Sequence, residues 1–329
     1  MNRKMKKSNR TGKYLIIACA SFFAGAFVTA LLFLLPCITP LHVNYDPFNG
    51  FSYTVYADHV EIEKYRGNAG TVLMPDSVLG RPVTVIWNQC FFMNKKIEIV
   101  VLPKHLEGIR DSTFLYCTQL KAVAGGKNVR YIGISAFEQC GRLCYLELGK
   151  NLEEINPHAF AGCASLKEVA FPDRIKYIEG GAFANSGIEK LPEDMQADYI
   201  GPNVFIGTPW LEGREEEFVV YSGILLRYNG KGGIVRVPEG VKGISYAFAV
   251  PKDAKEGDYP PIQELYLPDS VQCIHDDAFD DREIERIYIP ASVTEIGVNS
   301  WGMTGLTIGK DFTIVTTSGS AAEAYAKEN

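Results

Sequence analysis

The chain has 329 residues, of which 47% are hydrophobic, so it can bury a sizeable core and is not a disordered protein. Its charge is unevenly distributed along the sequence. Six of the 33 Lys and Arg residues precede position 14, and the remaining 27 stand against 39 Asp and Glu. Because such an acidic body repels phosphate backbones, the composition excludes nucleic acid as the expected partner.

The first predicted element is an uncharged segment, residues 14–35 (YLIIACASFFAGAFVTALLFLL). A helix of that length, at about 1.5 Å per residue, spans the hydrocarbon core of a bilayer. We therefore expect a retained signal anchor in the cell membrane, with the basic stub 1–13 in the cytoplasm and residues 36–329 outside. The alternative is a cleaved signal peptide, whose apolar region is shorter, about 7 to 15 residues.

The anchor is followed by a Pro-containing linker, residues 36–50, and then by a predicted hairpin in residues 51–69. The stretches FSYTVYA and VEIEKY in this hairpin alternate apolar and polar residues, which is typical of strands. Without a cap, the first coil of a stacked array would expose its apolar core, because no coil covers it on that side. We therefore expect the hairpin to cap the array.

A repeat of 23 residues, with one later step of 22, runs through the following part of the chain. An Ile five positions before each Phe keeps the same interval, from Ile86 to Ile178. The recurring Phe residues are Phe91, Phe114, Phe137, Phe160, Phe183, Phe205 and, later in the chain, Phe279. A period of about 20 to 29 residues with Leu-rich spacing indicates a leucine-rich-repeat solenoid. The predicted fold is mainly β with short turns and helices, in about nine coils over residues 70–211 and 234–316.

Coils of this kind bury their apolar residues against the coils above and below, so equal positions stack. We expect the Phe at the turn opposite the strand, and a small buried residue closing the same turn at Cys117, Cys140 and Cys163. Two states of these cysteines fit the spacing. We favour a column of free thiols, because parallel Cβ vectors oppose pairing; a disulfide between adjacent coils is the alternative.

These units resemble the BspA-type leucine-rich repeats of bacterial surface proteins, with the pattern L-x-x-V-x-L-P-x-x-V-x-x-I-x-x-x-A-F-x-x-C. The resemblance is carried by LPKHLEGIRDSTFLYC, FPDRIKYIEGGAFANS and LPDSVQCIHDDAFDD, and it covers residues 70 to about 316. It implies a secreted or anchored binding protein, usually an adhesin or a host-contact surface. It identifies no ligand.

Two segments leave the repeat. Residues 212–233 contain FVVYSGILLRYNGKGG, which predicts a second hairpin with a Gly-rich turn, and an insertion at residues 251–261 lengthens one coil. Insertions in solenoids map to loops on one rim, often the binding rim. The tail, residues 317–329, is similar to the short helical end of BspA-type chains.

The sequence carries no enzymatic motif: HExxH, GxSxG, CxxC and the phosphate-binding GxxxxGK are absent, and the five His residues are dispersed. The string HDDAFDD gathers four carboxylates beside Phe279, and carboxylate oxygens can hold calcium. Their spacing matches no calcium loop, so we read them as solvent-facing residues. We expect no enzyme activity, no cofactor and no metal.

The outward strand positions are the best candidates for contact with a partner, because alternation leaves two of them per coil facing solvent. Exposed Tyr and Arg are favoured contact residues, although Tyr is also simply a good strand former. The candidate ligand face consists of Tyr145, Glu147, Glu264, Tyr266, Arg286 and Tyr288. The expected partner is an extracellular protein or glycan. A role as spacer or scaffold for other envelope proteins is the alternative.

Overall fold

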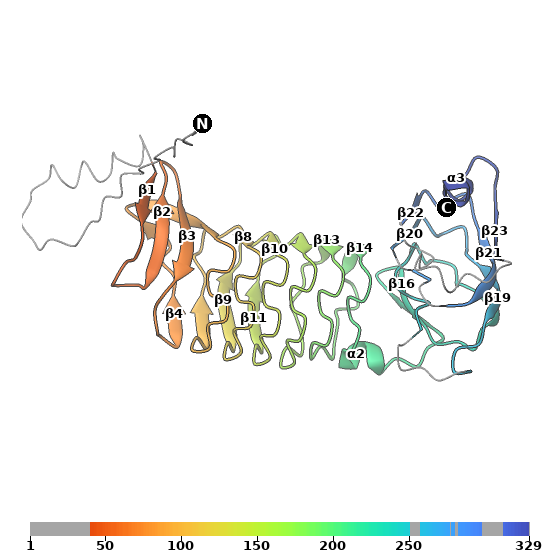
Figure 1. Cartoon of the computed structure of the whole chain (residues 1–329), viewed down its shortest axis with the longest axis horizontal. Helices are drawn as coiled ribbons and strands as arrows, with labels where there is room; N and C mark the ends of the chain where they lie inside the picture. Colours follow the sequence, from red (N-terminus) through yellow and green to blue (C-terminus); the bar gives the residue numbers. More distant parts are fainter. Residues whose placement is uncertain (1–39, 251–256, 277, 280–281, 298–311, 329) are drawn as a thin grey trace, which may run out of the picture.

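The computed structural model describes residues 40–250, 257–276, 278–279, 282–297 and 312–328. They build an elongated β-solenoid of about ten turns, with a hairpin at the N-terminal end and a helix near the C-terminus (Figure 1). The predicted anchor, residues 14–35, lies outside the described residues. Within the described ranges, no helix has the length and apolar character needed to cross a bilayer.

One side of the solenoid is a parallel sheet in the order β11-β9-β7-β4. Its strands are β4 (Thr71–Leu73), β7 (Ile99–Val101), β9 (Ala122–Gly126) and β11 (Tyr145–Leu148). Side chains alternate along a strand, so Val72, Val100, Val123 and Leu146 stack inside the core, where all four are buried.

A second ladder covers the next side of each coil, and several of its strands have only two residues. Its parallel members are β3 (Val60–Tyr65), β6 (Arg81–Ile86), β8 (Gly108–Ile109), β10 (Tyr131–Ile132), β12 (Glu154–Ile155), β13 (Arg174–Ile178) and β14 (Gln196–Ile200). From β6 to β14, each strand ends on a fully buried Ile. The predicted Ile column is therefore the inner edge of this ladder.

The Phe residues lie on the third side of the coils and form one stack. From Phe91 to Phe183, neighbouring ring centroids are 4.9 to 5.2 Å apart and the ring planes lie within 14° of parallel. Phe205 continues the stack at 5.7 Å and then meets Trp210 edge-on. The predicted vertical register of the rings is confirmed for these coils.

The loops that carry the rings are held to one another by backbone hydrogen bonds. Left-handed residues recur in them, such as Ser112 (φ 54) and Tyr116 (φ 59). These turns direct alternate N–H groups toward the next coil, where the N–H of Phe114 donates to the carbonyl of Ala136 at 2.7 Å. The loops thereby satisfy their backbone without forming a strand.

The cysteine column is a ladder of thiol hydrogen bonds. Cys117, Cys140 and Cys163 each donate to the carbonyl oxygen of the Phe in the preceding coil, at 3.1 to 3.2 Å. These three cysteines are free, as expected, and burial raises the pKa of Cys117 to about 12. Ser186 occupies the next rung, and its buried hydroxyl has no partner among the described residues.

The N-terminal cap is larger than the sequence predicts. The expected hairpin is present as β2 (Phe51–Val55) paired antiparallel with β3. The segment predicted as a linker, residues 36–50, is not a linker throughout, because β1 (Leu41–Val43) lies within it and adds a third strand to β2. Leu41 is buried there, which explains why this short segment joins the sheet. A further short strand, β5 (Ser77–Val78), pairs with β6.

After β14 the array is interrupted by the short helix α2 (Pro209–Glu212) and by a second hairpin, β15 (Phe218–Tyr221) and β16 (Ile224–Tyr228). The hairpin is confirmed, but its predicted Gly-rich turn is wrong. The turn is the pair Ser222 and Gly223, both at positive φ, since pairing brings the strand ends together across two residues. The string 229–233 instead leads into β17 (Gly233–Arg236).

Both ladders begin again at this hairpin, in the orders β16-β18-β20-β22 and β17-β19-β21-β23. The new strands are β18 (Gly243–Ile244), β19 (Ile262–Tyr266), β20 (Cys273–Ile274), β21 (Ile284–Ile289), β22 (Glu295–Ile296) and β23 (Thr313–Thr316). Helix α3 (Ala321–Glu328), predicted in the tail, packs on β22 and β23. The buried core divides into two clusters between Ile224 and Leu225. The solenoid therefore consists of two stacks.

The second hairpin repeats the N-terminal cap in detail. Tyr65 and Tyr228 each accept, through the hydroxyl, the backbone N–H four residues ahead at 3.3 Å. Each also covers the Gly two residues ahead, where a Cβ would overlap the hydroxyl. Their rings pack on Phe91 and Phe248, the first Phe of each stack, at 5.1 and 5.2 Å. The described chain is thus a tandem of two capped units.

At the junction, side chains of the second unit bond to the free edge of β14. Ser245 donates to the carbonyl of Gly201 at 2.9 Å, and Nδ1 of His275 lies 3.0 Å from the carbonyl oxygen of Ile200. Ser222 accepts an N–H of β14 at 2.7 Å. These side-chain bonds satisfy backbone N–H and C=O groups that are paired with a neighbouring strand elsewhere in the solenoid.

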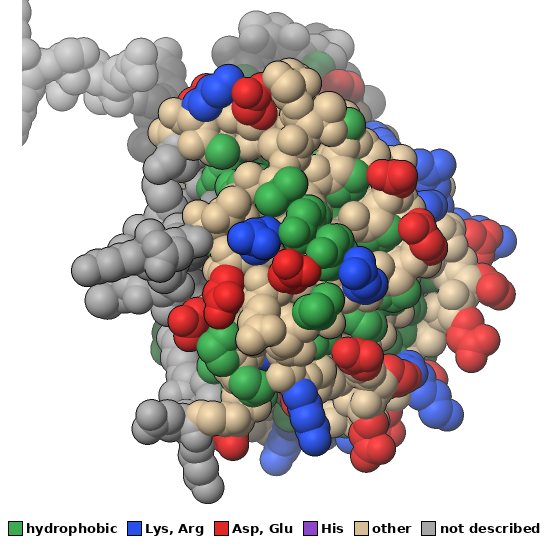
Figure 2. All heavy atoms as spheres, turned by 90° about the vertical axis from the view of Figure 1, so that its right-hand side faces the viewer, with side chains coloured by type: hydrophobic (Ala, Val, Ile, Leu, Met, Phe, Trp, Pro, Cys, Tyr) green, Lys and Arg blue, Asp and Glu red, His purple; other side chains and the backbone are tan. Residues whose placement is uncertain are grey.

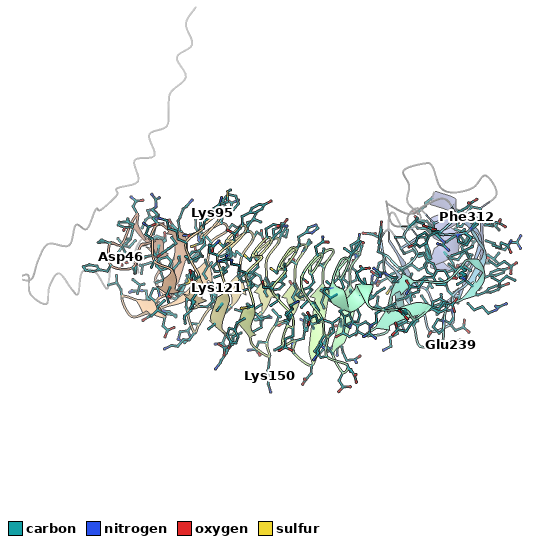
Figure 3. All side chains as sticks on the ribbon, turned by 90° about the horizontal axis from the view of Figure 1, so that it is seen from below. Asp46, Lys95, Lys121, Lys150, Glu239 and Phe312 are labelled. Atoms are coloured by element: carbon teal, nitrogen blue, oxygen red, sulfur yellow. The ribbon has the colours of Figure 1, made fainter. Side chains whose placement is uncertain are left out.

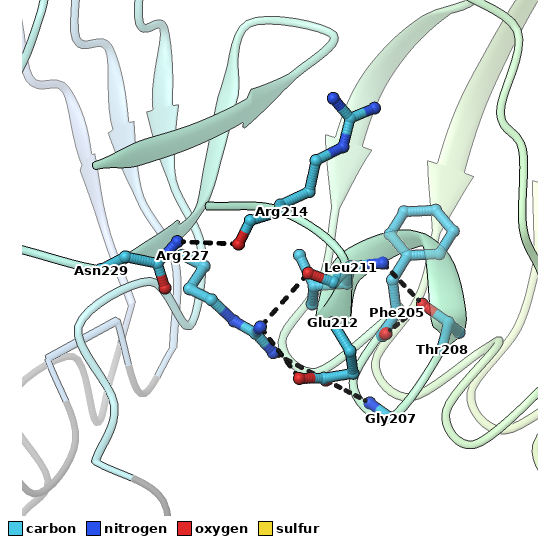
Figure 4. A network of polar contacts seen from close by, with 8 residues as sticks. All are labelled: Phe205, Gly207, Thr208, Leu211, Glu212, Arg214, Arg227 and Asn229. Carbon is cyan, nitrogen blue, oxygen red and sulfur yellow. Dashed lines mark hydrogen bonds and ion pairs between the residues drawn. The ribbon is translucent and has the colours of Figure 1, made fainter. Parts of the chain in front are cut away.

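The helix α2 is tied to the second hairpin by a polar network (Figure 4). Arg227 holds the carboxylate of Glu212 with two nitrogens, at 2.8 and 3.0 Å, and also reaches the carbonyl of Leu211. Asn229 donates to the carbonyl of Arg214. This bidentate pair, together with the bonds to β14, fixes the second unit on the end of the first.

Candidate binding surface

The predicted outward positions of the first unit do lie on the solvent face of the β4-β7-β9-β11 sheet. In register, Ile99, Ala122 and Tyr145 form one column, and Tyr145 is 54% exposed. Glu147 lies on the same face, where it accepts the N–H of Gly125 at 2.8 Å. Lys95 and Lys150 lie on opposite edges of this array (Figure 3).

The equivalent sheet of the second unit carries different chemistry. Tyr266 and Tyr288 lie side by side in register, with ring centroids 4.1 Å apart and planes at 4°. The guanidinium of Arg236 covers the other face of Tyr266 at 3.9 Å. Hydrophobic side chains gather in the middle of this side of the molecule, with basic and acidic groups around them (Figure 2). We call Arg236, Tyr266 and Tyr288 the aromatic ladder.

The aromatic ladder is tied to the neighbouring polar column. The hydroxyl of Tyr266 donates to Glu264 at 2.6 Å, and the same carboxylate pairs with Arg286 at 3.4 Å. The hydrogen bond to Glu264 raises the pKa of Tyr266 to about 12. These contacts hold the side chains in one arrangement. The side chains therefore lose less conformational entropy when a partner binds.

The six predicted face residues therefore do not form one surface. Tyr145 and Glu147 belong to the sheet of the first unit, whereas Glu264, Tyr266, Arg286 and Tyr288 belong to that of the second.

Arg236, which stacks on Tyr266, and Ile234 beside it on β17 are not among the residues predicted from the sequence. The alternation in IVRV, directly before a Pro as in the other strands, is the signal that could have revealed them.

A Cys–His pair is also present, on the second ladder. The Sγ atom of Cys273 lies 3.3 Å from Nε2 of His275. Burial raises the pKa of Cys273 to about 11 and lowers that of His275 to about 4, so both groups are neutral near pH 7. A catalytic cysteine needs the opposite shifts, because the thiolate is the nucleophile. This arrangement therefore does not favour nucleophilic chemistry.

One pocket on the described surface is smaller than most ligand sites. A pocket of about 170 Å³ lies between Glu107, Arg130, Tyr131 and Glu153, where Arg130 and Glu153 form an ion pair. Ligand pockets usually measure about 300 to 1,000 Å³.

The described ranges contain no group of three or more residues that could hold a metal ion. Of the HDDAFDD carboxylates, Asp276 is described and exposed; the other three lie outside these ranges.

Several solved structures resemble this chain. A leucine rich cell surface protein from Faecalibacterium prausnitzii is 21% identical with a TM-score of 0.44, covering 88% of this chain and 97% of that one. A leucine-rich repeat protein from Eubacterium ventriosum is 18% identical with a TM-score of 0.41, covering 79% and 68%. The pneumococcal vaccine antigen PcpA is 16% identical with a TM-score of 0.38, covering 79% and 78%. A comparison with curated proteins gives no match.

The repeat pattern itself gives the family. The BspA type leucine rich repeat region matches in six copies, over residues 84–212 and 258–315, which is more than half of the chain. The matched ranges contain the Phe stack of the first unit and most of the second unit's repeated strands. The chain belongs to the family of BspA-type leucine-rich repeat proteins.

Proposed function

We propose that this protein is a membrane-anchored extracellular binding protein, and that the aromatic ladder of the second unit contacts an extracellular protein or glycan. The observation that carries the proposal is a comparison of equivalent positions. Where β7 and β9 present Val101 and Ala124 to solvent, β19 and β21 present Tyr266 and Tyr288. Because the first unit folds with small apolar residues at these positions, the fold does not require the tyrosines.

The chemistry of the ladder suits recognition. Tyr and Arg are enriched among residues that dominate binding energy, because they combine large contact area with polar ends. Here the two rings are stacked and Arg236 lies over one of them, so little side-chain freedom remains to be lost on binding. The anchor proposed for residues 14–35 would display this face outside the cell, with the N-terminus in the cytoplasm.

The test is saturable binding by a fragment of residues 36–329, which contains every described element. Extracts of host tissue and of bacterial cell wall provide the candidate partners. The double variant Tyr266→Ala and Tyr288→Ala should lose binding by at least about tenfold, as expected for hot-spot residues. The matched control is Tyr177→Ala, which removes a tyrosine on β13 of the first unit whose side chain is 45% exposed. Equal loss in both variants, or no retained partner, would contradict the proposal.

A second candidate function is a scaffold for other envelope proteins, favoured by the apolar face of the first unit. Leu73 is 68% exposed on the edge strand β4, and Ile99 on the neighbouring strand β7 is 40% exposed. Contiguous apolar surface of this kind usually marks contact with another protein. Crosslinking in intact cells separates the two functions: partners that come only from the same membrane, and that are lost with Leu73→Asp, would favour the scaffold.

A further inference from the structure

A buried arginine stands in the second unit at the rung where the first unit has thiols. Arg282 lies three residues after Phe279, as Cys117 lies three residues after Phe114, and its N–H donates to the Phe279 carbonyl in the same way. It is only 4% exposed. A long cation therefore replaces a small neutral group in the interior of the stack, which the fold itself does not demand.

The surroundings of Arg282 contain aromatic rings. Its guanidinium lies 5.8 Å from the ring of Tyr228, on β16, and 5.4 Å from that of Tyr259, which lies shortly before β19. Such rings attract a cation but accept no strong hydrogen bond. The hydroxyl of Tyr228 accepts the N–H of Gly232, and its own O–H proton remains available to a further acceptor.

Two guanidinium nitrogens of Arg282, Nε and Nη2, are buried without a hydrogen-bond partner in the part of the chain that the structure describes. The ion pairs among those residues also omit Arg282, although Glu283 follows it directly. Nε–H and Nη2–H point from the same edge of the guanidinium and form a fork that fits two oxygens of one anion. A buried charge of this kind normally has a partner.

We propose that Arg282, with Tyr228 and Tyr259, forms a binding site for an anion that presents two oxygens, a carboxylate or a phosphate group. The fork holds the two oxygens, while the two tyrosine rings, at 5.8 and 5.4 Å, attract the cation. The site lies in the second unit, on residues separate from the aromatic ladder. It is independent of the binding role proposed above.

The experiment measures thermal unfolding of the full chain in sodium phosphate and, separately, in sodium acetate, against sodium chloride of equal ionic strength. One or both anions should raise the unfolding temperature of the wild type saturably, and the two arms identify whether phosphate or carboxylate is preferred. Arg282→Met should remove the rise. Arg282→Lys keeps the charge without the fork, so its apparent affinity should fall by at least about tenfold. Arg142→Met, which removes an exposed arginine of the first unit, should respond as the wild type does.

A second measurement covers the case in which the Arg282 variants fail to fold. Near-ultraviolet circular dichroism of the wild type should change saturably with the stabilising anion, because Tyr228 and Tyr259 flank the site. The proposal is overturned if neither anion changes the wild-type spectrum, or if Arg282→Met shows the same anion dependence as the wild type.

Discussion

Acidification should loosen the junction between the two units, because His275 is held there in its neutral form. Nδ1 lies 3.0 Å from the carbonyl oxygen of Ile200, and since a carbonyl only accepts, Nδ1 carries the proton. Protonation would add charge at Nε2, which faces the thiol of Cys273. Burial lowers the pKa of His275 from 6.5 to about 4, and the neighbouring carboxylate of Asp276 only partly offsets this shift.

The sign and size of the effect follow from linkage. Between pH 6.5 and about 4 the unfolded chain binds a proton at this position that the folded chain does not, so stability falls as the pH falls. A shift of about 2.5 units corresponds to about 3 kcal/mol at 1.36 kcal/mol per unit. Below pH 4 both states are protonated and the loss is complete. Glu179, whose burial raises its pKa, contributes with the opposite sign.

The assay is urea unfolding at pH 7.0, 5.5 and 4.5 for the wild type, His275→Gln and the exposed-histidine control His158→Gln. The difference between the wild type and His275→Gln isolates the imidazole, because Glu179 and the other acids are common to both proteins. Because the assay stops above pH 4, we expect the wild type and His158→Gln to lose about 2 kcal/mol more than His275→Gln between pH 7.0 and 4.5. Equal pH dependence in all three proteins would refute the claim that burial keeps this imidazole neutral.

Three further predictions concern packing and the junction. Phe137→Ala removes a fully buried ring from the middle of the stack and should lower the free energy of unfolding by about 3 to 5 kcal/mol in chemical denaturation. Ser186→Cys should raise it by about 1 kcal/mol, because the longer thiol can reach the Phe160 carbonyl as the other cysteines reach theirs; a lower value would contradict the thiol ladder. Arg227→Met breaks the pair with Glu212 and should cost about 1 kcal/mol, with less effect at high salt.

The sequence predicts the packing of the solenoid well, because stacking imposes one demand at each equivalent position. Phe137 must fill the coil and Ile132 must close the second ladder, so both recur at a fixed interval and can be read directly. Elements that form by pairing at an edge leave no such signal. Leu41 enters the cap through one neighbouring strand, and two-residue strands such as β10 are too short to alternate.

The division into two units was harder to foresee from the sequence. The Gly-rich string after Tyr228 looks more like a turn than Ser222 and Gly223 do, yet strand register decides the turn. The similarity of the two caps is not visible in the sequence, because the strands of the second hairpin are shorter than those of the first. For the candidate surface, Tyr266 and Tyr288 were predictable from strand alternation, whereas the stacking of Arg236 depends on which strands become neighbours after the interruption.

The junction also bears on how the protein responds to mechanical load. Hydrogen bonds between coils run along the long axis, so a pull along that axis stretches them in parallel, many per coil. At β14 they are replaced by a few side-chain contacts from Ser222, Ser245 and His275. Tension along the axis should therefore part the molecule there first, while the strand ladders on either side of the junction stay paired.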